Sequence, residues 1–193
     1  MAFFRSSLNE QFPVIEGRGI FLRAPQMADY AEWAQLRAAS RDFLTPWEPV
    51  WPSDDLSRAA FRRRLKRYAE EMRADQAYAF LLFRAGDEAL AGGITLTNLR
   101  RGVAQAGSIG YWMGAQFARQ GLMTAAVSVL APFAFEHLRL HRLEAACIPT
   151  NAASIRLLEK TGFQREGYAR EYLCINGVWA DHVLYARLRS DGA

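Results

Sequence analysis

The chain has 193 residues and a formal net charge of +4. With 51% hydrophobic residues, a chain of this length can bury its own core without disulfides or metals, so we predict a single domain over residues 1–193. No run approaches the roughly 20 apolar residues of a membrane span, and the start MAFFRSSLNE lacks the apolar core of a secretory signal. We therefore expect a cytoplasmic protein with no membrane partner. Cys147 and Cys174 lack the spacing of metal ligands or of a disulfide framework, so no metal is expected.

The first half of the chain is predicted to alternate between extended and helical segments. Residues 19–25 form a strand that stops at Pro25, and residues 27–40 a helix. A loop rich in Pro and Trp at 43–54 leads into a second helix, with Ser53 as its N-cap and acidic residues in its first turn. An antiparallel meander of three strands follows, at 77–83, 89–99 and 106–113.

The second half places one crossover helix between strands. Pro132 inside this helix predicts a kink, and Asn176-Gly177 predicts a type I′ hairpin, because both turn residues must adopt positive φ. The expected elements are a helix at 121–138, a strand at 141–148, a helix at 151–162, and strands at 163–176 and 178–188. The order predicts an α+β fold.

Almost all of the basic residues are arginine, a side chain that stacks on bases and binds phosphates. The composition therefore permits a weak contact with RNA or with the ribosome. Genome base composition also produces arginine-rich chains, and the basic run at 62–67 is typical of a solvated helix face. A monomer and a homodimer are both compatible with the sequence.

The stretch FARQGLMTAA, residues 117–126, passes through a turn into the crossover helix. The first N–H groups of a helix have no intrahelical acceptor and its dipole favours negative charge, so this turn is a candidate phosphate site. Gly121 would let a pyrophosphate approach the backbone, and Arg119 would add positive charge. A plain strand-to-helix turn also explains one glycine. The chain has neither Gly-Lys-Ser/Thr nor Gly-x-Gly-x-x-Gly, which argues against nucleoside triphosphate hydrolysis and dinucleotide binding.

A second polar segment opens the helix at 151–162, where Asn151 and Ser154 occupy N-cap-like positions one turn apart. YWMGAQFARQGLMTAA followed by PTNAASIRLLEKTGFQREG resembles the signature of the GNAT superfamily of acetyl-CoA-dependent N-acetyltransferases. The tail GYAREYLCINGVWADHVLYARL resembles the RimJ/RimL branch, which acetylates ribosomal-protein N-termini, and RimJ in particular. The resemblance spans residues 18–188. It implies a mixed, mostly antiparallel sheet with helices on both faces, splayed open near its middle.

The resemblance also implies where acetyl-CoA, the expected cosubstrate, would bind. The backbone of the strand at 111–113 would pair with the pantetheine arm, and Asn151 and Ser154 would contact that arm near the thiol. Ala118 and Met123 depart from the general loop pattern, but backbone amides rather than side chains would bind the cofactor. The implied cofactor-binding residues are Tyr111, Trp112, Met113, Arg119, Gln120, Gly121, Leu122, Met123, Thr124, Asn151 and Ser154.

The resemblance identifies less directly the residue that would protonate the departing thiolate. Many members of the superfamily use a tyrosine at the position that Leu158 occupies here. The RimJ/RimL branch is thought to use the serine of Asn-x-x-Ser instead, which nominates Ser154. A role as a helix cap explains this serine as well.

Two glutamates are candidates for the general base. A peptide α-amine has a pKa of about 8, so a weak base or a water relay suffices. Glu144 is the first candidate, because it shares a strand face with Ala146, the position of a catalytic glutamate in a sister branch. Glu171 is the second candidate, although the glutamate base known best in the superfamily aligns with Leu173. A salt bridge to arginine explains either glutamate.

The acceptor implied by the resemblance is a protein N-terminal α-amine, in particular the N-terminal alanine of a small-subunit ribosomal protein. The loop at 43–54 and the hairpin at 172–181 would line the acceptor slot, with Trp47, Trp51 and Tyr172 as walls, unless these aromatic residues serve core packing. Two alternatives stay open. The acceptor could be a small amine such as an amino acid, polyamine or antibiotic, or the protein could be a ribosome-associated assembly or RNA-binding factor.

Overall fold

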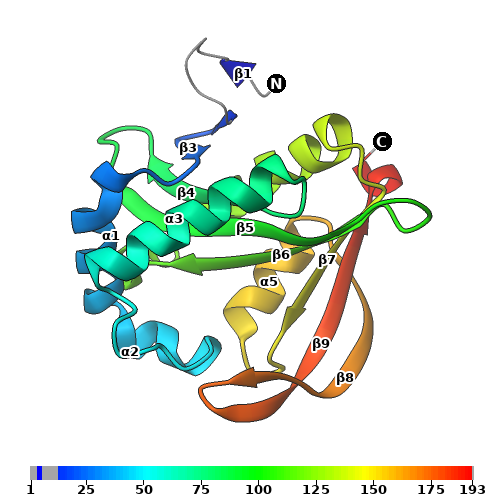
Figure 1. The fold of residues 1–193 in the computed structure, drawn as a ribbon. Coiled ribbons are helices and arrows are strands. Elements are labelled where there is room, and N and C mark those ends of the chain that lie inside the picture. The colour runs from blue at the N-terminus through cyan, green and yellow to red at the C-terminus, as the bar shows by residue number, and fades with distance from the viewer. Residues whose placement is uncertain (1–3, 6–12, 193) are drawn as a thin grey trace.

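A computed structural model describes residues 4–5 and 13–192 of the chain. One mixed sheet runs through these residues in the order β1-β2-β3-β4-β5-β6-β7-β9-β8 (Figure 1). Neighbouring strands are antiparallel except β6 and β7, which are parallel and are joined by a crossover helix. The strands are β1 Phe4–Arg5, β2 Val14–Gly17, β3 Ile20–Arg23, β4 Tyr78–Arg84, β5 Leu90–Arg100, β6 Ala106–Met113, β7 Arg142–Cys147, β8 Gln164–Ile175 and β9 Val178–Leu188. The predicted meander corresponds to β4, β5 and β6.

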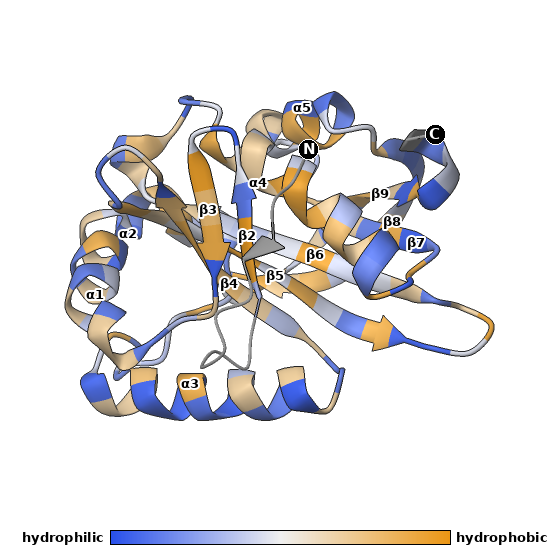
Figure 2. Ribbon diagram, turned by 90° about the horizontal axis from the view of Figure 1, so that it is seen from above, coloured by the Kyte–Doolittle hydropathy of each residue, from blue (hydrophilic) through white to orange (hydrophobic). Residues whose placement is uncertain are grey.

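Helices cover both faces of the sheet. In the view of Figure 2, α3 lies along one face, and α4 and α5 lie on the other. The helices are α1 Tyr30–Ala39, α2 Arg41–Leu44, α3 Arg58–Arg73, α4 Leu122–Pro132 and α5 Ala152–Lys160. Short 3-10 turns occupy Met27–Asp29, Thr45–Trp47, Ala115–Phe117 and Arg189–Gly192. Within the described residues, no helix combines the length and the apolar character that crossing a membrane requires.

The core lies between the central strands and these helices. Residues 79–83 of β4 are all buried, because helices cover both sides of this strand. Its sequence is therefore a continuous apolar run rather than an alternating one. Ala126, Val127, Leu130 and Ala131 of α4 are buried against the same layer, which fixes the position of α4 on the sheet.

The N-cap of α3 is Ser57, so the prediction of Ser53 is wrong. Ser57 has extended dihedrals, and its Oγ accepts the Ala60 N–H at 3.1 Å. Two backbone hydrogen bonds, Asp55 N–H to Pro52 and Ser57 N–H to Asp54, hold the preceding residues in turns. The acidic residues expected in the first turn of the helix therefore lie before it.

The type I′ turn predicted for Asn176-Gly177 is confirmed, and at Pro132, where the sequence predicts a kink, the helix changes type. Asn176 and Gly177 have φ of +47° and +82°, as a type I′ turn requires. The α-helical stretch ends at Pro132 and continues as a π-helix over Phe133–His137, where the Leu138 N–H donates to the Phe133 carbonyl. Because proline supplies no N–H and crowds the preceding turn, the regular ladder is interrupted at this point.

Candidate active site

The central feature of the site is an opening between β6 and β7. These strands pair only at Ala106 with Arg142, Gly107 with Leu143, and Ser108 with Glu144. Beyond this point the outer edge of β6 still pairs with β5, and that of β7 with β9. The facing inner edges have no strand partner in the described part of the chain. An extended ligand can add to such an edge through its own polar groups.

The loop before α4 follows the C-terminal end of β6, where the sheet is open, and it presents backbone N–H groups there. Arg119 and Gly121 adopt left-handed conformations, with φ of +63° and +78°, and Gly121 is the N-cap residue of α4. The first helix-closing bond of α4 runs from the Ala125 N–H to the Gly121 carbonyl. In the part of the chain that the structure describes, the amides of residues 119–124 donate to no protein acceptor.

This loop fits a diphosphate group. A Cβ built on Gly121 would meet no protein atom within 4 Å, so the space beside the backbone is open. Consecutive amides near left-handed residues form a concave donor surface for anions, and the α4 dipole adds to its positive potential. The structure therefore places, among the residues that it describes, a loop with unpaired amides next to an unpaired strand edge.

Asn151 and Ser154 have different positions in α5. Asn151 is the N-cap, and its side-chain oxygen accepts the Ser154 N–H at 3.0 Å. Ser154 lies inside the first turn, so the prediction that it occupies a second N-cap position is wrong. Its amide is capped by Asn151, and its hydroxyl is used elsewhere: Ser154 Oγ lies 2.7 Å from the hydroxyl of Tyr111. Leu158, one turn further on, is fully buried in the core.

Tyr111, Ser154 and Cys147 form a small polar cluster at the opening. Burial raises the pKa of Tyr111 far above its usual range, and the hydrogen bond with Ser154 only partly offsets the rise. Burial also raises the pKa of Cys147, again partly offset by Ser154. Tyr111 and Cys147 are therefore neutral near pH 7. Sequence reasoning considered the backbone of Tyr111 and missed its side chain, which meets a residue 43 positions away.

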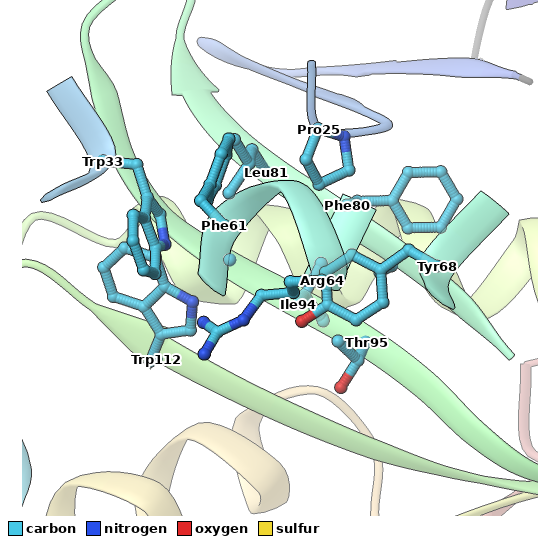
Figure 3. A pocket seen from close by; sticks show the side chains of 12 residues that line it. Pro25, Trp33, Phe61, Arg64, Tyr68, Phe80, Leu81, Ile94, Thr95 and Trp112 are labelled. Carbon is cyan, nitrogen blue, oxygen red and sulfur yellow. The ribbon is translucent and has the colours of Figure 1, made fainter. Parts of the chain in front are cut away.

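The side chain of Trp112 points to the opposite face of the sheet. Figure 3 shows its indole in a pocket with Trp33, Phe61 and Arg64, on the side covered by α3. Its ring also packs directly on Gly93, where a Cβ would come within 2.5 Å of the indole nitrogen. The Trp112 carbonyl lies toward β5 rather than toward the opening, because a Cβ built on Gly92 would clash with it.

An ion pair fixes the loop that was predicted to line the acceptor slot. The guanidinium of Arg37 donates twice to Glu48, at 2.7 Å each, and the Trp51 indole N–H donates to the same carboxylate at 2.7 Å. The Arg37 guanidinium also lies 4.1 Å from the centre of the Trp51 ring. The Asn176 N–H at the hairpin tip donates to the Glu48 carbonyl at 2.8 Å. The loop and the hairpin, far apart in sequence, are thus joined.

The two candidate bases have different surroundings. Both carboxylate oxygens of Glu144 are used, one by Arg100 and the other by Arg142 at 3.0 Å, so its salt-bridge alternative is present. Glu171 is exposed in a bulge of β8, with φ of +46°, and its backbone N–H donates to Asp181 at 2.8 Å. Among the described residues, its carboxylate has no ion pair or hydrogen bond.

The basic run on α3 forms a solvated surface. Arg62, Arg63, Lys66 and Arg67 are exposed. Arg63 pairs with Asp54, and Lys66 and Arg67 pair with glutamates one helical turn further on. This arrangement explains the run without RNA.

Comparison with known proteins agrees with this geometry. The family described as "Acetyltransferase (GNAT) domain" matches residues 20–164. "Probable N-acetyltransferase YjcK" of Bacillus subtilis is 36% identical over 178 residues, which cover 92% of this chain and 98% of that protein. The ribosomal protein uS5-alanine N-acetyltransferase of Escherichia coli is 34% identical over 166 residues, which cover 86% of this chain and 82% of that protein.

The solved structure of Mycobacterium smegmatis RimJ in complex with CoA-disulfide has the same fold, with a TM-score of 0.86 and 28% identity. The match covers 93% of this chain and 88% of that chain. The family match spans most of the sequence, and the two relatives align over most of their own length. The chain therefore belongs to the GNAT family of acetyltransferases and is an N-acetyltransferase.

Proposed function

We propose that the protein transfers an acetyl group from acetyl-CoA to the N-terminal α-amine of a protein, and that the acceptor begins with alanine in a small-subunit ribosomal protein. The observation that carries the transfer is the run of amides at residues 119–124, which have no acceptor in the described part of the chain and lie next to the open edge of β6. The acceptor is supported by the relative from Escherichia coli, which is named for the alanine of ribosomal protein uS5.

Residues on both sides of the opening would bind acetyl-CoA. The amides of residues 119–124 would bind its diphosphate, and the backbone at 111–113 would lie along its pantetheine arm. Asn151 and Ser154 would lie near the thioester. The presence of CoA-disulfide in the related Mycobacterium smegmatis structure supports this assignment. No metal ion is needed for it.

The chemistry requires a neutral amine, a base and a group that supports the departing sulfur. The amine attacks the thioester carbonyl, a C–N bond forms, and the C–S bond breaks with its electron pair going to sulfur. Glu171, whose carboxylate has no partner among the residues that the structure describes, is a better candidate than the doubly paired Glu144 to take the proton that the amine loses. Ser154 would donate to the sulfur, and solvent returns the balance of protons.

The surface around the slot suits a peptide more than a polyamine. Exposed apolar side chains lie on both the loop and the hairpin that Glu48 and Asn176 join. They are Phe43, Trp47, Val50, Tyr172, Leu173, Val178 and Trp179. Exposed apolar patches mark protein interaction sites, whereas a polyamine requires a dense group of carboxylates.

A screen of acceptors with acetyl-CoA tests the proposal through release of the CoA thiol. Peptides that begin with alanine should be acetylated, and the same peptides with a blocked N-terminus should not. Free amino acids, polyamines and aminoglycosides serve as small-amine competitors. Turnover on small amines with none on any free peptide N-terminus would replace the peptide acceptor. RNA binding that weakens steeply with salt, without turnover on any amine, would favour the RNA-binding alternative.

A further inference from the structure

The hydrogen bond between Tyr111 and Ser154 crosses the opening of the sheet. Tyr111 lies on β6, three residues beyond the last pair with β7, and Ser154 lies on the helix that follows β7. Their hydroxyl oxygens are 2.7 Å apart. This bond therefore joins the two diverging halves at the place where the proposed pantetheine arm ends.

The chemistry of the two hydroxyls limits how this bond can be used. Because burial disfavours ionisation of Tyr111, the phenol keeps its proton and can act as a donor. A serine hydroxyl has one proton and two lone pairs. When Tyr111 donates to Ser154, the Ser154 proton is available to a second acceptor, and the sulfur of Cys147 is one neighbour that can accept it.

The position of Ser154 is fixed from its backbone side. Its amide donates to Asn151, so rotation about the side-chain bond is the main freedom that the hydroxyl retains. A donor bond from Tyr111 restricts this rotation. The thiol of Cys147, which is buried and neutral, neighbours the same hydroxyl.

We propose that Tyr111 is a positioning residue for the transfer reaction, which holds the Ser154 hydroxyl so that its proton points at the sulfur of the bound thioester. Tyr111 itself loses no proton in this step. The amine forms its bond to the acetyl carbon, the C–S bond breaks, and Ser154 donates a hydrogen bond to the sulfur as it becomes a thiolate. The proton lost by the amine and the one gained by the thiolate exchange through solvent. The inference rests on the proposed acetyl transfer at this site.

Tyr111→Phe removes the phenol oxygen and keeps the ring. We expect kcat to fall about 5- to 10-fold, the effect of one oriented hydrogen bond, with the KM for acetyl-CoA unchanged. In a Ser154→Ala background the same substitution should have no further effect on kcat. Tyr185→Phe is the matched control, because the Tyr185 hydroxyl donates to Glu159 of the same helix at 3.3 Å and, among the described residues, forms no hydrogen bond with Ser154. Its kcat should equal that of the wild type.

Calorimetry with CoA and desulfo-CoA at pH 9 provides a readout that needs no acceptor. Wild-type protein should bind CoA more tightly than desulfo-CoA. In Tyr111→Phe and Ser154→Ala, the affinity for CoA should fall about 3- to 10-fold, and the affinity for desulfo-CoA should stay unchanged. If the bond were only structural, its loss would weaken the binding of both ligands equally, and that result would overturn the proposal. A full kcat in Tyr111→Phe would also overturn it. If no amine is turned over by the wild type, the proposed function fails, and the calorimetric comparison still decides the role of Tyr111.

Discussion

Replacing Gly121 with alanine tests whether the loop before α4 binds the diphosphate. Gly121 has a φ of +78°, and a Cβ there would meet no protein atom within 4 Å, so packing within the protein does not oppose the change. What remains is the cost of a left-handed conformation for a residue with a Cβ, about 1–2 kcal/mol.

This cost must appear in one of two measurable quantities. If the free loop of the variant keeps its conformation, the free energy of unfolding falls by about 1–2 kcal/mol, which lowers Tm by about 2–4 °C for each kcal/mol. If the free loop relaxes, the cost is moved to CoA binding, and the affinity falls by about 5- to 30-fold. A methyl group in the space assigned to the diphosphate lowers the affinity further.

Gly19→Ala is the control for this substitution. Gly19 has a φ of +74° in the turn between β2 and β3, and a Cβ there also meets nothing within 4 Å. Its variant should lose stability only. Thermal unfolding and calorimetric titration with CoA measure both quantities for both proteins. If Gly121→Ala binds CoA as tightly as Gly19→Ala does, the diphosphate lies elsewhere.

Three further predictions concern the candidate base, the loop and the helix cap. Glu171→Gln should lower kcat on an alanine peptide by about 100-fold, and Glu144→Gln should leave it near the wild-type value; the opposite order would make Glu144 the base. Glu48→Gln leaves the buried guanidinium of Arg37 without its counter-charge, so urea unfolding should show a loss of about 3 kcal/mol, and an unchanged midpoint would disprove the importance of this pair. Asn151→Ala removes the N-cap of α5 and should cost about 1 kcal/mol in the same assay, unless another acceptor replaces it.

Local chemistry explains which features the sequence predicts well. Hydrophobic periodicity marks strands and helices because each element must bury one face, and the meander and the crossover helix follow from it. Asn176-Gly177 predicts its turn because few residue pairs accept positive φ twice. The family resemblance depends on short motifs and carries the fold with it. Ser53 and Ser57 are indistinguishable in this way, since both precede a helical pattern.

The tertiary structure decided the contacts between residues that are distant in sequence. The separation of β6 from β7, the bond between Tyr111 and Ser154, and the link from Asn176 to Glu48 all depend on how the elements pack. The pairing of Glu144 with two arginines also depends on this packing. By itself, the sequence determined the family and the type of most elements, although not of β1, β2 and α2, because these properties depend mainly on neighbours along the chain. The partners of each side chain at the site came only with the folded chain, because a hydrogen bond requires two groups within about 3 Å in space, whatever their separation in sequence.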